Sequence, residues 1–269
     1  MQRHDAYKPL PNEMEKFLDR RRGLSVSGDG IFATFQGEGV SAGLPAVFLR
    51  LQDCNLHCGR DGDGWRCDAW YTWDRCTPEF WKERKNESVQ NVKKQIEDTW
   101  NDRFGYTYIQ GQGMSRRLVI TGGEPLLQQD KIVKLIDQLD EDWVFEIETN
   151  GTILPFDGLS NCQINCSPKL SNSGNPICSR YKPSVLRAIS NMPNSWFKFV
   201  ISDYCDEEEV AQIVSECNIP IEKVLLMGEG TSTSELADKR RIVQEIAGHI
   251  GAVAIERNQI IWFGDKRRT

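Results

Sequence analysis

Four of the nine cysteines in the 269-residue chain fall within one short segment. They are Cys54, Cys58, Cys67 and Cys76, and the first three are spaced C-x3-C-x8-C. Thiolates are soft ligands that suit zinc or an iron–sulfur cluster. A closed zinc site needs a fourth ligand, which Cys76 or His57 could supply, whereas a [4Fe–4S] cluster held by three cysteines keeps one iron open to a small molecule. The cysteines alone leave both metals open.

The composition bounds the class of protein. The five other cysteines are scattered, and free cysteine commonly behaves as a small buried hydrophobe, so we expect them to be structural. A net charge of −6 argues against a protein that mainly binds nucleic acid through its phosphates. No apolar run is long enough to suggest a membrane span, and the N-terminal segment has no apolar signal core. We expect a soluble cytoplasmic enzyme with no membrane or nucleic-acid partner.

Short apolar or alternating blocks recur along the chain and predict β-strands. These blocks span 46–51, 118–120, 144–148, 163–166, 197–201 and 223–227. Helices are predicted around 88–100, 128–139, 183–191, 206–217 and 234–249, the last four from apolar residues at helical spacing. Alternation of strands and helices at this interval predicts parallel β/α units, either in a barrel or in an open sheet.

Small, polar or metal-binding residues follow five of these six blocks. In chain order they occupy 54–58, 121–125, 149–151, 167–169 and 228–230. In parallel β/α folds the active site lies at the carboxyl ends of the strands. We therefore expect these residues to share one pocket.

Further motifs stand around the cysteines in a fixed order. They are TFQGEG at 34–39, FLRL at 48–51, CDAWYTWD at 67–74, GGEP at 122–125 and SPK at 167–169. With the cysteines, this combination resembles the radical S-adenosylmethionine (SAM) enzymes and, within them, the 7-carboxy-7-deazaguanine synthase family of queuosine and deazapurine biosynthesis. The resemblance runs from about residue 30 to the C-terminus. Each motif alone is weak, but the ordered combination is highly specific.

The loop that carries the three cysteines, here called the cluster loop (52–74), departs from the family pattern in two ways. The family's third cysteine follows closely on the second, so 59–66 (GRDGDGWR) is interpreted as an insertion and Cys67, not Cys76, as the third ligand. Ala69 stands where the family has Thr or Ser, whose oxygen binds Mg²⁺, an ion that requires oxygen ligands. Mg²⁺ is then held by water and substrate alone, or by Asp68 or Thr72, or it is absent.

The resemblance implies a lyase that converts 6-carboxy-5,6,7,8-tetrahydropterin to 7-carboxy-7-deazaguanine with loss of ammonia. A [4Fe–4S] cluster on Cys54, Cys58 and Cys67 would bind SAM at its open iron and cleave it by one-electron reduction. The 5′-deoxyadenosyl radical would take a hydrogen atom from the pterin, and SAM would be regenerated after ring contraction. The cofactors carry the hard chemistry, while the protein orients the reactants and excludes water.

The resemblance also assigns residues to the SAM site. Gly122 and Gly123 would let the backbone approach the ligand, and Glu124 would accept hydrogen bonds from the amino group of SAM. The expected set is Arg66, Asp68, Gly122, Gly123, Glu124, Glu148, Asn150, Ser167, Pro168, Lys169, Met227, Gly228, Glu229 and Gly230.

A second set is expected at the pterin. Phe35, Gln36 and the Gly37 backbone would bind the ring edge, and Arg50 would pair bidentately with the carboxylate. The resemblance adds Thr121 and, at the C-terminus, Thr269.

The implied fold is α/β, an incomplete, modified β/α TIM-like barrel of the radical SAM type. We expect a single domain over 1–269, with an N-terminal extension at 1–29, the loop insertion at 59–66 and an insertion with a helix at 76–113. The resemblance further implies a homodimer and an electron donor such as a flavodoxin.

Two other functions fit parts of the sequence. One is a radical SAM activase that places a glycyl radical on a partner protein, since the cysteines and GGEP do not exclude it. The other is a non-catalytic protein with a four-cysteine zinc site that uses Cys76.

Overall fold

The computed structural model describes residues 6–18, 23–105 and 115–268. Their strands form one nine-stranded sheet in the order β3-β1-β2-β4-β5-β6-β7-β8-β9. The strand bounds are β1 Leu24–Phe35, β2 Pro45–Leu51, β3 Lys85–Glu87, β4 Arg116–Gly122, β5 Trp143–Thr149, β6 Gln163–Cys166, β7 Ser195–Ile201, β8 Val224–Gly228 and β9 Val253–Ile255.

Most of the sheet is parallel. From β2 through β4 to β9, every neighbouring pair of strands is parallel, whereas β1 pairs antiparallel with both β2 and β3. Within the described residues β3 and β9 each pair with a single strand, so the sheet stays open between them. The predicted incomplete β/α barrel is confirmed.

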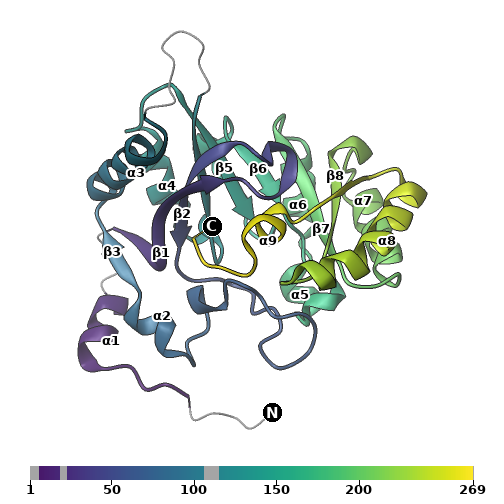
Figure 1. Cartoon of the computed structure of the whole chain (residues 1–269), viewed down its shortest axis with the longest axis horizontal. Helices are drawn as coiled ribbons and strands as arrows, with labels where there is room; N and C mark the ends of the chain where they lie inside the picture. The colour runs from purple at the N-terminus through teal and green to yellow at the C-terminus, as the bar shows by residue number, and fades with distance from the viewer. Residues whose placement is uncertain (1–5, 19–22, 106–114, 269) are drawn as a thin grey trace.

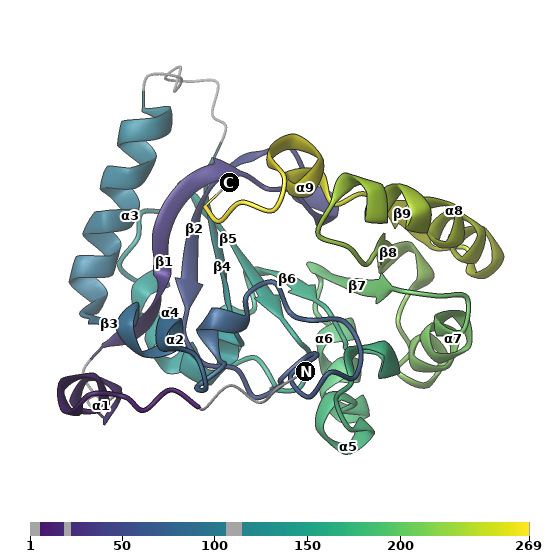
Figure 2. The same ribbon diagram turned by 60° about the horizontal axis from the view of Figure 1, so that its bottom comes forward.

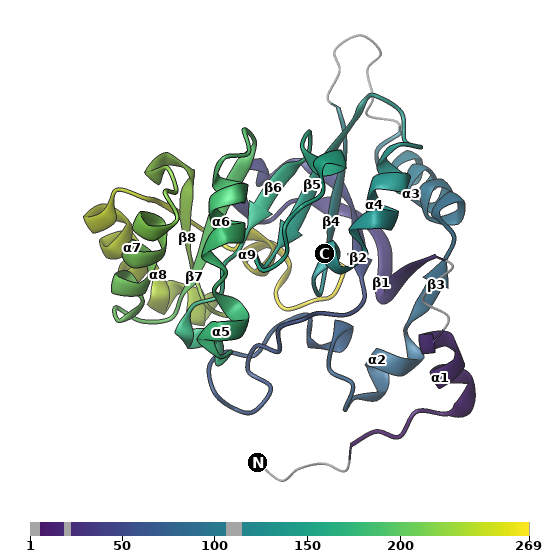
Figure 3. The same ribbon diagram turned by 180° about the vertical axis from the view of Figure 1, so that it is seen from behind.

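The helices lie mainly on one side of the curved sheet. Their bounds are α1 Pro11–Leu18, α2 Pro78–Lys82, α3 Val89–Phe104, α4 Gln129–Ile136, α5 Ile177–Arg180, α6 Pro183–Ser190, α7 Asp206–Glu216, α8 Thr233–Ile250 and α9 Asn258–Phe263. Figures 1 and 3 show α3, α4, α6 and α7 along the outer face, while α9 and the loop after β2 lie on the inner face. In Figure 2, seen from below, the loop after β2 lies in front of the strand ends, and α9 lies near the top of the view, between β1 and β9. None of the described helices is long and apolar enough to cross a membrane.

The core lies between the strands and the outer helices. One contiguous cluster of buried side chains extends from Leu24 on β1 to Ala247 on α8. A second, smaller cluster on the sheet joins Ala46, Phe48 and Val119, with Phe32 packed against it. The large cluster holds the outer helices on the sheet. The strand ends and the inner face of the sheet remain available to form a site.

All six predicted strands and all five predicted helices are present, with small shifts at their ends. Sequence reasoning missed β1, β3, β9 and the helices α1, α2, α5 and α9. Within 76–113, the described residues form α2, β3 and α3. Four α3 side chains are buried, among them Ile96 and Trp100, and α3 packs on β1 and β2. It therefore serves as the crossover helix between the parallel strands β2 and β4.

Candidate active site

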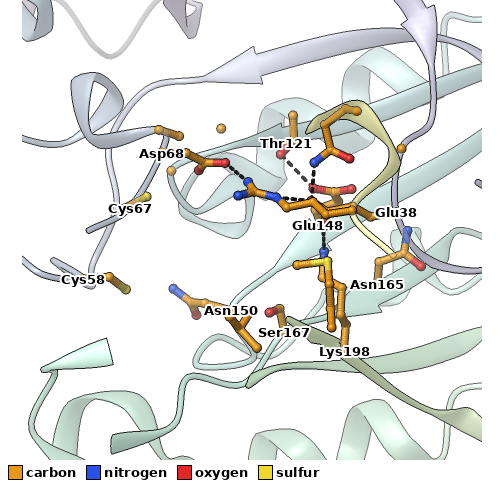
Figure 4. Close-up of a pocket in the computed structure, with 18 of the residues that line it drawn as sticks. Glu38, Cys58, Cys67, Asp68, Thr121, Glu148, Asn150, Asn165, Ser167 and Lys198 are labelled. Carbon is orange, nitrogen blue, oxygen red and sulfur yellow. Dashed lines mark hydrogen bonds and ion pairs between the residues drawn. The ribbon is translucent and has the colours of Figure 1, made fainter. Parts of the chain in front are cut away.

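One cavity of about 250 Å³ opens at the carboxyl ends of the parallel strands. Its wall draws on β1, β2, the loop after β2, the ends of β4 to β8, and residues 257 and 259. Figure 4 shows Cys58, Cys67 and Asp68 on one side of this pocket and Glu38, Glu148 and Lys198 on another. The polar segments that follow the strands thus meet in one place, as expected.

Most predicted site residues line this pocket. They are Phe35, Gln36, Gly37, Arg50, Cys54, Cys58, Arg66, Cys67, Asp68, Thr121, Gly122, Gly123, Glu148, Asn150, Ser167, Lys169, Met227, Gly228, Glu229 and Gly230. Glu124, Pro168 and Thr72 are buried and do not line it. Thr269 lies outside the described residues.

The three cysteines of the C-x3-C-x8-C motif all face the pocket. Polar N–H groups point at two of their sulfurs: Asn175 Nδ2 donates to Cys58 Sγ at 3.1 Å, and the Leu56 amide donates to Cys54 Sγ at 3.4 Å. Burial raises the pKa of all three thiols, that of Cys67 to about 12. Because a metal binds the thiolate, loading this site must release protons.

The donor set fits an iron–sulfur cluster better than a single metal ion. Among the described residues, no group of three or more His, Cys, Asp or Glu side chains lies close enough to hold one ion. A cluster does not require this, since each cysteine binds a different iron atom. Cys76 is exposed and does not line the pocket, and the ring of His57 packs against Trp73 with centroids 5.0 Å apart. Neither side chain completes a four-ligand zinc site.

The segment 59–66 is held against the segment after β6. The Gly59 amide donates to Ser173 O at 3.1 Å, and both the amide and the indole of Trp65 donate to Asn172. Gly59 has a φ of 69°, and a Cβ there would lie 2.5 Å from Trp65 O, so only glycine fits. These contacts turn the loop back, and the Cys67 amide donates to Cys58 O at 3.3 Å.

The two glycines of GGEP make room for neighbouring backbone. A Cβ on Gly122 would lie 2.1 Å from Leu51 O, and one on Gly123 would lie 2.1 Å from Asp53 O. The Gly123 and Glu124 amides donate to these same two oxygens at 3.2 and 2.9 Å. The end of β4 therefore packs directly on the start of the cluster loop.

Glu124 acts inside the wall of the pocket rather than on its surface. Its carboxylate accepts hydrogen bonds from the Leu126 amide, the Thr149 hydroxyl and the Asn150 amide at 2.7–3.0 Å. Burial outweighs these bonds and raises its pKa. The side chain does not line the pocket, so its expected contact with the amino group of SAM stays a prediction. Its evident role is to hold Asn150, which does line the pocket.

Two of the predicted pterin residues are hydrogen-bonded to Glu148. Gln36 Nε2 donates to Glu148 Oε1 at 3.2 Å, and the Thr121 hydroxyl donates to Glu148 Oε2 at 3.1 Å. The Phe32 and Phe48 rings stack beside them with centroids 5.4 Å apart, and the Arg50 guanidinium lies 5.9 Å from the Phe32 ring. This wall offers apolar faces and hydrogen-bonding groups, which a planar, polar heterocycle requires.

A charged network that sequence reasoning missed crosses the pocket. Glu38 forms ion pairs with Lys198 and Arg257, and Arg257 also pairs with Asp68. Gln259 donates a further hydrogen bond to Glu38. Burial alone would raise the pKa of Glu38, but the charges of Lys198 and Arg257 outweigh it and hold this pKa below its ordinary value.

Further residues line the pocket, and of these Leu56 and Thr149 belong to segments that were expected there. Those not yet named as lining the pocket are Thr149, Asn165, Val200 and Thr231, beside Leu56, Trp65, Ala69 and Trp73 of the cluster loop. Two strand residues had a usable signal, since Asn165 and Lys198 interrupt β6 and β7 with polar side chains. In β7 exposure alternates strictly, and Lys198 shares the more exposed face with Val200.

The sequence was compared with protein-family models and with known proteins. No protein-family model matches the chain. The chain is 31% identical over 240 residues to the 7-carboxy-7-deazaguanine synthase of Pyrobaculum aerophilum, covering 88% of this chain and 94% of that protein. It is 29% identical to the enzyme of the same name from Halobacterium salinarum, covering 92% and 97% of the two chains.

Among solved structures, the fold is similar to that of QueE from Escherichia coli. The TM-score is 0.62 at 21% sequence identity, over 87% of this chain and 93% of that one. The sequence relationship spans nearly the full length of both proteins, and the motif residues of the chain gather in one pocket. The chain therefore belongs to the 7-carboxy-7-deazaguanine synthase family.

Proposed function

We propose that the chain is a radical SAM lyase that converts 6-carboxy-5,6,7,8-tetrahydropterin to 7-carboxy-7-deazaguanine and ammonia. The observation that carries this proposal is the meeting of two sets of residues in one pocket. Three thiols suited to an iron–sulfur cluster line it together with the TFQGEG segment, Arg50 and Thr121. Full-length similarity to proteins of this name supports the same reaction.

Cys54, Cys58 and Cys67 would hold a [4Fe–4S] cluster, because they are the cysteines that line the pocket in the described part of the chain. Amide donors to the sulfurs, as found at Cys58 and Cys54, are typical of Fe–S sites. The cluster and SAM, when bound, supply the removal of a hydrogen atom from the substrate. Every other task falls to the protein.

The chain's own residues would bind and orient the two organic molecules. Ser167, Lys169 and Asn150 line the pocket beside the cysteines, where polar side chains can hold the amino acid end of SAM. Met227 and Gly228, at the buried end of β8, would cover its adenosine. On the other side, Arg50 would bind the pterin carboxylate in a two-pronged, charge-assisted contact.

Gln36, Thr121 and Glu148 would fix the orientation of the pterin ring. Because the Gln36 amide and the Thr121 hydroxyl both donate to Glu148, each is held in one rotamer before the ligand arrives. The stacked rings of Phe32 and Phe48 exclude water from this side. Such preorganisation lowers the entropy lost when the substrate is bound in a reactive geometry.

The family further suggests a homodimer and a small electron-transfer protein such as a flavodoxin as reductant, and we include both in the proposal. A single functional domain over the described residues agrees with the continuous core. Thr269 stays a predicted substrate contact.

The test is reconstitution without oxygen. The chain is loaded with iron and sulfide, mixed with SAM, the pterin and a chemical reductant, and the product is identified by mass spectrometry. We expect 7-carboxy-7-deazaguanine and ammonia, with SAM not consumed in proportion. A protein that carries zinc instead of iron and sulfide, or that yields no deazaguanine, would contradict the proposal.

Two cysteine variants give a matched control. Cys67→Ser should lose iron and activity, because its thiol faces the pocket. Cys76→Ser should keep both, because that thiol is exposed and does not line the pocket. Loss of metal in the Cys76 variant would instead support a four-cysteine zinc site.

A further inference from the structure

The side chain of Arg257 joins three segments that border the pocket. Its Nε donates to Glu38 Oε1 at 3.1 Å, its Nη1 donates to Gly230 O at 2.7 Å, and its Nη2 pairs with Asp68. Only 13% of the side chain is exposed. Asp68 directly follows the third cysteine, and Glu38 belongs to the TFQGEG segment, so the guanidinium spans both halves of the site. Figure 4 shows Asp68 and Glu38 on opposite sides of the pocket.

The backbone beside Arg257 is fixed as well. The Asn258 amide donates to Gly37 O at 3.0 Å, and Gln259 packs so closely on Gly37 that a Cβ there would lie 2.1 Å from Gln259 Oε1. The guanidinium is therefore held from two directions, by its own ion pairs and by the docking of its neighbours on the TFQGEG segment.

The same region does not fit the Mg²⁺ that the family resemblance implies. Ala69 has no side-chain oxygen. The Thr72 hydroxyl is fully buried, donates to Ala69 O at 2.7 Å and does not line the pocket. The remaining candidate, Asp68, carries the guanidinium of Arg257 on its carboxylate. Mg²⁺ requires near-octahedral oxygen ligands at about 2.1 Å, and a divalent ion on Asp68 would be repelled by the cation already there.

We infer that Arg257 takes the place of the divalent cation: its guanidinium supplies the positive charge beside the bound pterin, and this pocket takes no Mg²⁺. The inference rests on the proposed function, because it concerns the same substrate. It makes Arg257 a positioning residue, which acts through Glu38 and Asp68. Its charge neutralises these two carboxylates, which would otherwise repel the carboxylate of the pterin. Lys198 neutralises Glu38 from the other side and completes the arrangement.

The experiment uses Mn²⁺ as the probe, because electron paramagnetic resonance distinguishes its free and bound forms. The cluster-loaded wild-type chain is mixed without oxygen with SAM and the pterin, and no reductant is added, so the substrate stays intact. We expect the pterin to be retained and Mn²⁺ to remain free. One Mn²⁺ bound per chain, with the pterin retained, would overturn the inference and leave the proposed function intact. Failure to retain the pterin would overturn both.

Variants then test the replacement directly. Arg257→Met combined with Ala69→Thr should bind one Mn²⁺ in the presence of the pterin, while Ala69→Thr alone should bind none, because the guanidinium still holds Asp68. Arg257→Met alone should weaken pterin binding about 10-fold, since two carboxylates lose a charged hydrogen-bond partner. Arg240→Met is the control, because it removes a partly exposed arginine that is paired with Glu256. It should change neither the affinity for the pterin nor the binding of Mn²⁺.

Thermal denaturation of each variant shows whether it is folded. Should the double variant fail to fold, the wild-type Mn²⁺ measurement still decides the question. Mn²⁺ binding to Ala69→Thr alone would mean that Arg257 does not exclude the ion, and would overturn the inference.

Discussion

The side-chain amide of Asn175 donates a hydrogen bond to the sulfur of Cys58 at 3.1 Å, although 117 residues separate the two in the chain. Its Oδ1 accepts from the His57 amide at 2.9 Å, which fixes the orientation of the amide group. Asn175 therefore connects the segment after β6 to the cluster loop. Groups that hydrogen-bond to metal ligands in this way tune both affinity and reduction potential.

Replacing Asn175 by Ala should weaken the cluster without abolishing its binding. We expect iron affinity to fall about 10-fold, as for other residues behind metal ligands, and the reduction potential to become more negative. Iron content after challenge with a chelator, and a potentiometric titration, measure the two effects. The matched control is Asn101→Ala, at an exposed position of α3. Equal iron retention by both variants would mean that the Asn175 bond does not stabilise the cluster.

Gly123→Ala should disturb the contact between β4 and the cluster loop. The added Cβ would lie 2.1 Å from Asp53 O and 3.0 Å from Cys54 Cβ, and backbone cannot move aside cheaply. We expect a loss of about 2 kcal/mol in the free energy of unfolding, together with poor cluster loading.

Gly248→Ala provides the control for Gly123→Ala. A Cβ at this position of α8 would meet nothing within 4 Å, and alanine favours the helix by about 1 kcal/mol. Urea denaturation of the two variants should therefore shift in opposite directions. A harmless Gly123→Ala would show that the two segments are not packed as described.

Glu38 should make part of the stability depend on pH. Its pKa is held below the ordinary value of 4.5, so the folded state binds fewer protons at this group than the unfolded state does. The stabilisation is therefore present above pH 4.5 and is lost as the pH falls below it.

Glu38→Gln should reveal this contribution. At neutral pH Lys198 and Arg257 each lose the ion pair with Glu38, while Arg257 keeps the one with Asp68, and the variant should lose about 3 kcal/mol of unfolding free energy. The difference from the wild type should shrink when both are measured below pH 4.5. Glu222→Gln, at an exposed position, should follow the wild type throughout. A constant difference across the pH range would contradict the role of the Glu38 charge.

Arg50→Lys should impair recognition of the pterin carboxylate. Lysine keeps the charge but cannot form two parallel hydrogen bonds, and we expect kcat/KM to fall about 30-fold, mainly through KM. A pterin without the carboxylate is the control ligand, which the wild type and the variant should bind equally. If the variant loses affinity for both ligands alike, Arg50 does not bind the carboxylate.

The parallel strands β2 and β4 to β8 were predictable because each is a short apolar block with a clear end, whereas the parallel strand β9 has only three residues and was missed. β1 was not predictable either, since Leu24–Phe35 mixes polar residues and glycines with its apolar ones. Its register with β2 shifts between Val26 and Ile31, and Gly30 within this stretch has a φ of 62°. The strand thus depends on pairing with β2, a long-range interaction that local pattern does not encode.

The site residues also divide into those that contiguous motifs predict and those that depend on long-range contacts. Residues within contiguous motifs were placed in the pocket from the sequence: Thr121 because it stands at the end of a predicted strand, and Cys67 because the CDAWYTWD motif resembles the family's. Arg257 was missed because its ion-pair partners lie 219 and 189 residues away, at Glu38 and Asp68. Glu124 was expected at a ligand, but the motif does not show that three donors of its own chain enclose it.

The docking of residues 257–259 on the TFQGEG segment has a consequence for biogenesis. The ribosome synthesises the cluster loop long before Arg257 and Gln259. A nascent chain therefore has its three pocket thiols before the residues that dock on the TFQGEG segment exist. We expect iron and sulfide to enter most easily at that moment, before the last strand and helix dock. The order of synthesis and folding would then determine when the cluster is inserted, because the three thiols are more accessible before residues 257–259 dock than after they do.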